Sequence, residues 1–151
     1  MTDRTDLALD ADLAHVSTEI ARADQKAALL IGLAGAGLAV VAAAVRDYQL
    51  PVASQVIGGA GVAAFLAAIV TLLLVVRPNT SGGAPAGWPR WATCTPEQVL
   101  EHLAVDQRAE RLCRLSRLCA RKMRGIRHAV HLLLAGTGCL TVAALIAATL
   151  A

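Results

Sequence analysis

The residues of this chain whose types and spacing could do chemistry are two groups of charged side chains. Arginines recur at spacings of three and four along one stretch, which places them on one face of a helix. Guanidinium groups gathered on one face could bind the oxygens of a phosphate, or could lie against anionic lipid beside a membrane. A shorter charged motif lies far upstream. Together, the candidate ligand-binding residues are Arg22, Asp24, Lys26, Arg114, Arg117, Arg121 and Arg124.

The sequence contains no arrangement that predicts an enzyme. It has no Gly-x-Ser-x-Gly motif, no phosphate-binding glycine loop and no His-Glu-x-x-His zinc motif. The cysteines form neither a Cys-x-x-Cys pair nor a zinc spacing, so we expect them to be small packing residues. They are Cys94, Cys113, Cys119 and Cys139. We therefore expect no catalytic residue, no metal and no cofactor.

The elements that must position the charged residues are apolar helices. The chain is 56% hydrophobic, and three segments contain no Asp, Glu, Lys or Arg. Each segment is close to the roughly 20 residues that a helix needs to cross the hydrocarbon of a bilayer. The alternative, a soluble bundle of apolar helices, would keep a polar stripe on each helix. We expect an all-α integral membrane protein with three transmembrane helices and a small helical cytoplasmic module.

The basic residues predict the orientation. Ten of them lie between Arg77 and Arg127, and the segment that joins the first two apolar segments has only Arg46. Basic loops stay in the cytoplasm, so the N-terminus is expected there. The predicted parts are a cytoplasmic N-terminal helix (1–26), a first transmembrane helix (27–45), a short external loop (46–55), a second transmembrane helix (56–76), a cytoplasmic loop with a basic helix (77–128) and a third transmembrane helix (129–151).

Two helices outside the apolar segments are expected from their own signals. An apolar stripe at spacings of three and four precedes the first apolar segment, and no Gly or Pro separates the two, so one helix is expected to run through both. Thr95, Pro96 and Gln98 form a capping box with Pro at the first helical position. The helix that starts there is expected to reach about Gly125 or to continue into the third segment. Its predicted apolar stripe contains Val105, Ala109, Leu112, Cys119, Met123, Ile126 and Val130.

Glycines occur in every apolar segment and predict close helix packing. Gly59 and Ala63 form a small-xxx-small pattern, which lets two helix backbones approach each other. Such packing could occur within one subunit or between the subunits of a homo-oligomer.

One motif is similar to a known family. The segment His15-x-x-x-Glu19-x-x-Arg22-Ala23-Asp24-Gln25-Lys26-Ala27-Ala28-Leu29-Leu30 resembles the start of the transmembrane effectors of the Pycsar antiphage system. A weaker similarity follows at Val76-Arg77-Pro78 and at Leu115–Ala129. The layout covers nearly the whole chain, but only the Arg22–Lys26 motif is specific.

The resemblance implies a function that composition alone does not reveal. In such systems a pyrimidine nucleotide cyclase makes cyclic CMP (cCMP) or cyclic UMP (cUMP) upon infection, and the effector impairs the inner membrane and causes abortive infection. It implies a bacterial inner-membrane protein with the cyclase as its functional partner. From the residues we expect the lipid bilayer as a partner, and a homo-oligomer because three transmembrane helices of one chain enclose little volume. We expect no nucleic acid, because the net charge of +3 reflects topology. The alternatives are a ligand-independent membrane scaffold and a holin-like pore former.

A resting contact is a further hypothesis. Asp24 is expected to hold an arginine of the second helix until a phosphate competes for it. The alternative is that Asp24 and Lys26 only fix the topology of the first transmembrane helix.

Overall fold

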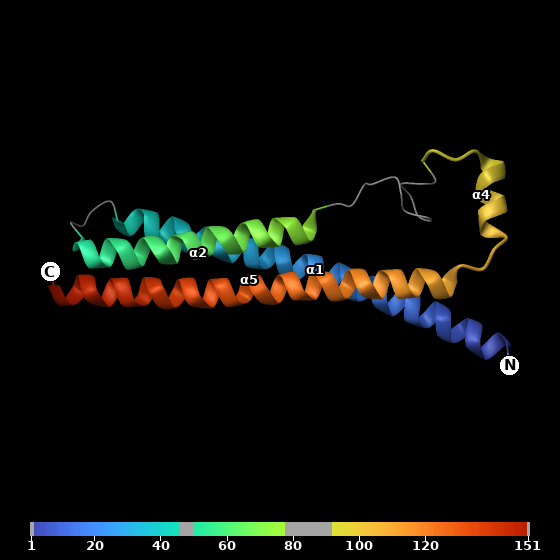
Figure 1. The fold of residues 1–151 in the computed structure, drawn as a ribbon, viewed down its shortest axis with the longest axis horizontal. Coiled ribbons are helices and arrows are strands. Elements are labelled where there is room, and N and C mark those ends of the chain that lie inside the picture. The colour runs from blue at the N-terminus through green and yellow to red at the C-terminus, as the bar shows by residue number, and fades with distance from the viewer. Residues whose placement is uncertain (1, 46–49, 78–91, 151) are drawn as a thin grey trace. The chain divides into compact units, whose positions relative to one another are not determined.

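Most of the chain that the structure describes is α-helical. The computed structural model describes residues 2–45, 50–77 and 92–150, and no strand occurs in these ranges (Figure 1). The helices are α1 (Thr2–Val45), α2 (Val52–Val76), α4 (Pro96–Leu103) and α5 (Arg108–Leu150). Three of them, α1, α2 and α5, are long and apolar enough to cross a membrane, which confirms the all-α prediction with three transmembrane helices.

The bounds of the first two helices follow the sequence signals closely. The first helix, α1, continues through residues 26 and 27 without a break, as the absence of Gly and Pro predicts. The second, α2, begins at Val52, inside the segment predicted as an external loop. The carbonyl oxygen of Pro51 accepts the backbone N–H of Gln55 at 3.0 Å, so helical hydrogen bonding begins there. Residues 46–49 of that predicted loop and residues 78–91 of the predicted cytoplasmic loop lie outside the described residues.

The start of α4 confirms the predicted capping box. The backbone N–H of Gln98 donates to Oγ1 of Thr95 at 3.4 Å, and the backbone N–H of Thr95 donates to Oε1 of Gln98 at 3.0 Å. Pro96 occupies the first helical position, where its missing N–H removes no helical bond. The side-chain oxygens of Thr95 and Gln98 thus each accept the backbone N–H of the other residue, which fixes where the helix begins.

The predicted single helix from Pro96 to Gly125 is wrong at residues 104–107, where α4 and α5 are separate. Oδ1 of Asp106 accepts the backbone N–H of Arg108 at 3.0 Å, an alternative to continued helical bonding that Asp side chains favour. Val105 is 61% exposed and Ala109 is also exposed, so the apolar stripe begins only at Leu112. The continuation of this helix through Gly125 into the third apolar segment is confirmed by α5.

The chain forms two compact units, and both α1 and α5 contribute to each. The first unit contains Met1–Ala21 and Arg77–Arg121, and the second contains Arg22–Val76 and Lys122–Ala151. In the second unit α1, α2 and α5 share a core of mostly small side chains, with Leu72 and Ile126 as its larger members. The core residues are Ala23, Ala27, Ala68, Leu72, Ile126 and Ala129. Small side chains let helix backbones approach closely, which is how helices associate where lipid removes the hydrophobic driving force.

Two glycines lie where the backbones of α2 and α5 approach each other closely. A Cβ atom placed on Gly61 would lie 3.0 Å from the carbonyl oxygen of Gly136 and 2.9 Å from Cγ of Leu140. A Cβ atom placed on Gly136 would lie 2.6 Å from Cδ2 of Phe65, and one on Gly37 of α1 would lie 3.1 Å from Cε1 of the same ring. The only phenylalanine of the chain therefore fills a notch between Gly37 and Gly136, which we call the Phe65 notch.

Other glycines face outward. A Cβ atom placed on any of four of them would meet no atom within 4 Å: Gly32, Gly35, Gly59 and Gly138. Gly59 and Gly61, two residues apart on α2, therefore have different surroundings. Gly61 packs against α5 within the chain, and Gly59 leaves open space beside α2.

A buried hydroxyl links α2 to α5 in the second unit. Ser54 is 3% exposed, and its Oγ donates to the carbonyl oxygen of Ala143 at 2.8 Å. Replacing Ser54 with alanine is expected to lower the free energy of unfolding by about 0.6 kcal/mol, the average of interhelical hydrogen bonds in membranes. The measurement is reversible unfolding in mixed detergent. Thr71→Ala is the control, because the Thr71 hydroxyl bonds only Ala67 of its own helix. An equal loss in both variants would contradict an interhelical role for Ser54.

Candidate functional site

An ion pair between α1 and α5 is the central polar contact of the second unit. Nζ of Lys122 donates to Oδ1 of Asp24 at 2.5 Å. The Lys122 side chain is 14% exposed and that of Asp24 is 38% exposed. Ala23, beside Asp24 in sequence, is fully buried, and Ile126, one turn after Lys122, also lies in the core. The pair therefore borders the apolar core, and partial burial strengthens its attraction relative to a solvated pair.

The predicted resting contact of Asp24 is present with a different partner. An arginine of the second helix was expected, and the residue that binds Asp24 is Lys122. The reason is helical phase. Lys122 is four residues before the buried Ile126 and shares its face, whereas Arg121 and Arg124 are exposed. Lys122 was not among the predicted partners, although it directly precedes Met123 of the predicted apolar stripe.

The predicted ligand residues are divided between the two units. Those in the second unit are Arg22, Asp24, Lys26 and Arg124, and those in the first are Arg114, Arg117 and Arg121. In the second unit Arg22, Lys26 and Arg124 are exposed. In the first, Arg114 is half-buried, whereas Arg117 and Arg121 are exposed.

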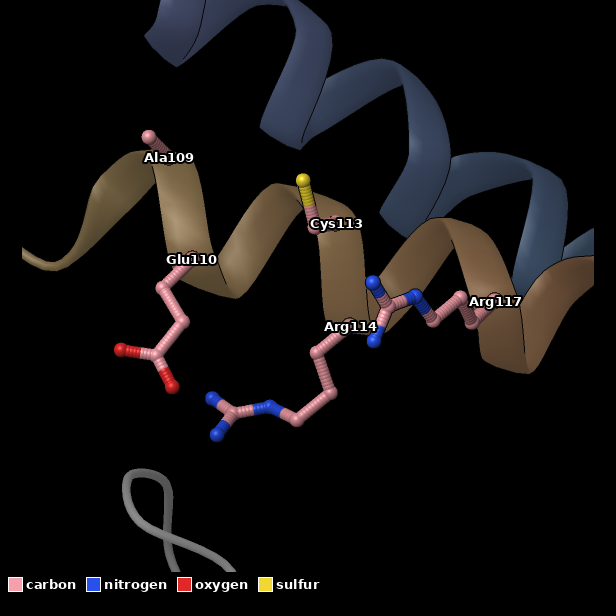
Figure 2. Close-up of a pocket in the computed structure, with 5 residues that line it drawn as sticks. All are labelled: Ala109, Glu110, Cys113, Arg114 and Arg117. Atoms are coloured by element: carbon pink, nitrogen blue, oxygen red, sulfur yellow. The ribbon is translucent and has the colours of Figure 1, made fainter.

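An open groove in the first unit brings Arg114 and Arg117 together. The described residues that line it come from one segment of α5: Ala109, Glu110, Cys113, Arg114 and Arg117. Figure 2 shows the Glu110 carboxylate and the Arg114 guanidinium extending from the same side of the helix, while the Cys113 sulfur points away from them. Because an acid lies beside the two arginines, the groove offers an anion less positive charge than the arginine stripe alone predicts.

A cluster of carboxylates around Arg108 was missed by the sequence analysis. In the first unit the Arg108 guanidinium contacts Asp6 at 2.6 Å, Asp10 at 3.3 Å and Asp106 at 3.0 Å. Hydrogen bonds from Arg108 lower the pKa of the Asp106 carboxyl below its usual 3.8. Two sequence signals could have revealed the cluster. Asp6 and Asp10 are four residues apart on one face of α1, and Asp106 lies just before a helix start.

The described residues offer no metal site. No group of three or more His, Cys, Asp or Glu side chains within residues 2–45, 50–77 and 92–150 could hold a metal ion. The four cysteines are free thiols.

A comparison with models of known protein families gives a match. The family model described as the Pycsar effector protein domain matches residues 8–150, which is nearly the whole chain. No curated protein and no solved structure matches the chain.

Proposed function

The chain belongs to the Pycsar effector family, and on this premise we propose that it responds to cCMP or cUMP by impairing the bacterial inner membrane. Membership supports the role of an antiphage effector and implies a nucleotide cyclase as functional partner. In this proposal the cyclase makes the messenger during infection, and the effector converts it into abortive infection. The observation that supports a switch within this chain is the Lys122–Asp24 ion pair.

The messenger and Asp24 carry the same chemical feature, an anionic oxygen. A cyclic nucleotide has a phosphodiester with one negative charge, and Lys122 donates hydrogen bonds to either anion. Binding of the messenger at Lys122 therefore displaces Asp24, since two anions compete for one ammonium group. Lys122 and Asp24 belong to α5 and α1, whose apolar parts pack together in the second unit, so the exchange acts directly on two transmembrane helices.

Expression with and without messenger tests this function. The full chain is produced in a bacterium that lacks the cyclase, and membrane potential is followed with a voltage-sensitive dye after cCMP, cUMP or cyclic AMP (cAMP) is supplied. Depolarisation is expected with cCMP or cUMP and not with cAMP. Depolarisation without any messenger would favour the holin-like alternative. An unchanged potential under every condition would favour the scaffold and contradict the proposed response.

The proposed orientation places the N-terminus in the cytoplasm and the C-terminus outside the inner membrane. Three transmembrane helices and the ten basic residues between Arg77 and Arg127 support this arrangement. A C-terminal alkaline phosphatase fusion is expected to be active, and a C-terminal fluorescent protein that folds only in the cytoplasm is expected to be dark. The opposite pair of results would contradict the orientation.

The proposed effector acts as a homo-oligomer. Three helices of one chain enclose little volume, because their facing surfaces are filled by the core of the second unit. A membrane lesion therefore requires several copies. The outward-facing glycines, of which Gly59 is one, offer room for the helices of a neighbouring copy.

A further inference from the structure

The charged side chains of the second unit gather beside the start of its apolar helical segments. Residues 27–45, 50–76 and 128–150 contain no Asp, Glu, Lys or Arg, so the described charges lie just before two of these segments, on α1 and α5. They are Arg22, Asp24, Lys26, Lys122, Arg124 and Arg127. One carboxylate thus accompanies five cations, and that carboxylate is already bound by Lys122.

Lys26 and Arg127 are two cations of this set whose surroundings suggest a bound anion. Both are exposed, and among the residues that the structure describes neither forms an ion pair with a carboxylate. Lys26 directly precedes the buried Ala27, and Arg127 directly follows the buried Ile126. They therefore lie beside the packed core of the second unit without being part of it.

Exposed apolar side chains follow each cation on the same face of its helix. Leu29 and Leu33 are three and seven residues after Lys26 and are 68% and 69% exposed. Leu134 is seven residues after Arg127 and is 65% exposed. At 1.5 Å per residue these apolar side chains lie about 4.5 to 10 Å further along the helix axis. A cation followed at this interval by apolar surface matches a phospholipid, whose phosphate lies above its acyl chains.

We propose that Lys26 and Arg127 dock the headgroups of anionic phospholipids, with Leu29, Leu33 and Leu134 against the acyl chains. Charge decides between lipid and a second copy of this chain. The same surface of a second copy would bring the same excess of cations, and its Asp24 would already be occupied. A free phosphate would neutralise the cations but would make no contact with the leucines. Anionic phospholipid satisfies both parts of the surface.

The test measures lipid preference without any messenger. The full chain is reconstituted into mixed phosphatidylglycerol and phosphatidylcholine nanodiscs, and bound lipid is quantified by competition between spin-labelled forms of each. A basic residue near an anionic surface contributes about 1 kcal/mol, or about fivefold in affinity. The preference for phosphatidylglycerol is expected to fall about fivefold in Lys26→Gln and in Arg127→Gln, and further in the double variant. Lys26→Arg and Arg127→Lys are expected to retain it.

The control is Arg111→Gln, which removes one exposed arginine of α5 in the first unit and is expected to leave the preference unchanged. The unaltered protein provides a measurement that needs no variant. Raising the salt from about 0.1 to 1 M shortens the Debye length from about 10 to 3 Å and should reduce the preference. A salt-independent preference, equal losses in Arg111→Gln, or unchanged preference in the double variant would each overturn the proposal. Altered crosslinking between copies at unchanged lipid preference would assign this surface to a subunit contact instead and would also overturn it.

Discussion

Replacing Gly61 with leucine is expected to prevent α2 and α5 from packing in the second unit. The added side chain would begin 3.0 Å from a backbone carbonyl oxygen of α5, and a backbone cannot rotate aside as a side chain can. Overpacking costs about 1–3 kcal/mol where side chains move, so a backbone contact is expected to lose about 3 kcal/mol or more. Unfolding in mixed detergent measures the loss directly.

The matched substitution two residues earlier separates folding from assembly. Gly59→Leu adds the same atoms to the same helix, but the space beside Gly59 is empty within the chain. Its unfolding free energy is expected to stay within about 0.5 kcal/mol of the unaltered protein or to rise, because leucine favours helix over glycine. Crosslinking between copies and membrane depolarisation are both expected to weaken. If Gly59→Leu crosslinks and depolarises like the parent, this face of α2 is not a subunit contact.

The second large effect is expected at the Lys122–Asp24 pair. Asp24→Ala removes the carboxylate that pairs with the mostly buried Lys122. An ion pair of this partial burial contributes about 1–3 kcal/mol to stability, a value between those of exposed pairs and fully buried pairs. We expect this variant to depolarise the membrane without messenger. Arg121→Glu, which places a negative charge next to Lys122 in sequence, is expected to lose the response to cCMP or cUMP because it repels an anion.

A double variant and a control make the prediction specific. Asp24→Ala with Lys122→Met replaces the pair by apolar side chains, which is often neutral for stability. We therefore expect this double variant to leave the membrane potential unchanged, both without and with messenger. Asp12→Ala removes an exposed carboxylate from the same helix and should behave like the parent. Should Asp24→Ala insert correctly and stay silent until messenger is added, the pair is a structural contact and the messenger acts elsewhere.

The features that depend on neighbouring residues could be predicted from the sequence. Thr95 and Gln98 are three residues apart, and their capping box forms as the sequence predicts. The break at Asp106 was also a local signal, but apolar periodicity on both sides of it predicted a continuous helix. The spacing of apolar residues does not show that the Asp106 side chain can accept a backbone N–H in place of the hydrogen bond that would continue the helix.

The features that depend on contacts between helices could not be predicted. The sequence places Gly59 and Gly61 in one cluster, and only the packing of α2 against α5 determines that Gly61 is covered and Gly59 is open. The same limit applies to Asp24. A cation on α5 could be expected to bind it, but choosing Lys122 over the neighbouring Arg121 requires the rotation of α5 about its own axis. Helix rotation is set by packing and is not encoded in any short motif.

The Phe65 notch restricts which motions the second unit can make. Moving α5 along its axis by one turn, about 5.4 Å, would replace Gly136 opposite Phe65 by Leu132 or Leu140. Neither leucine leaves room for an aromatic ring that already lies 2.6 Å from where a Cβ of residue 136 would be. Displacement of α5 by a full turn is thereby opposed, whereas tilting about the contact of Gly61 with Gly136 keeps the ring in place. We therefore expect a motion between α2 and α5 to be a change of their crossing angle.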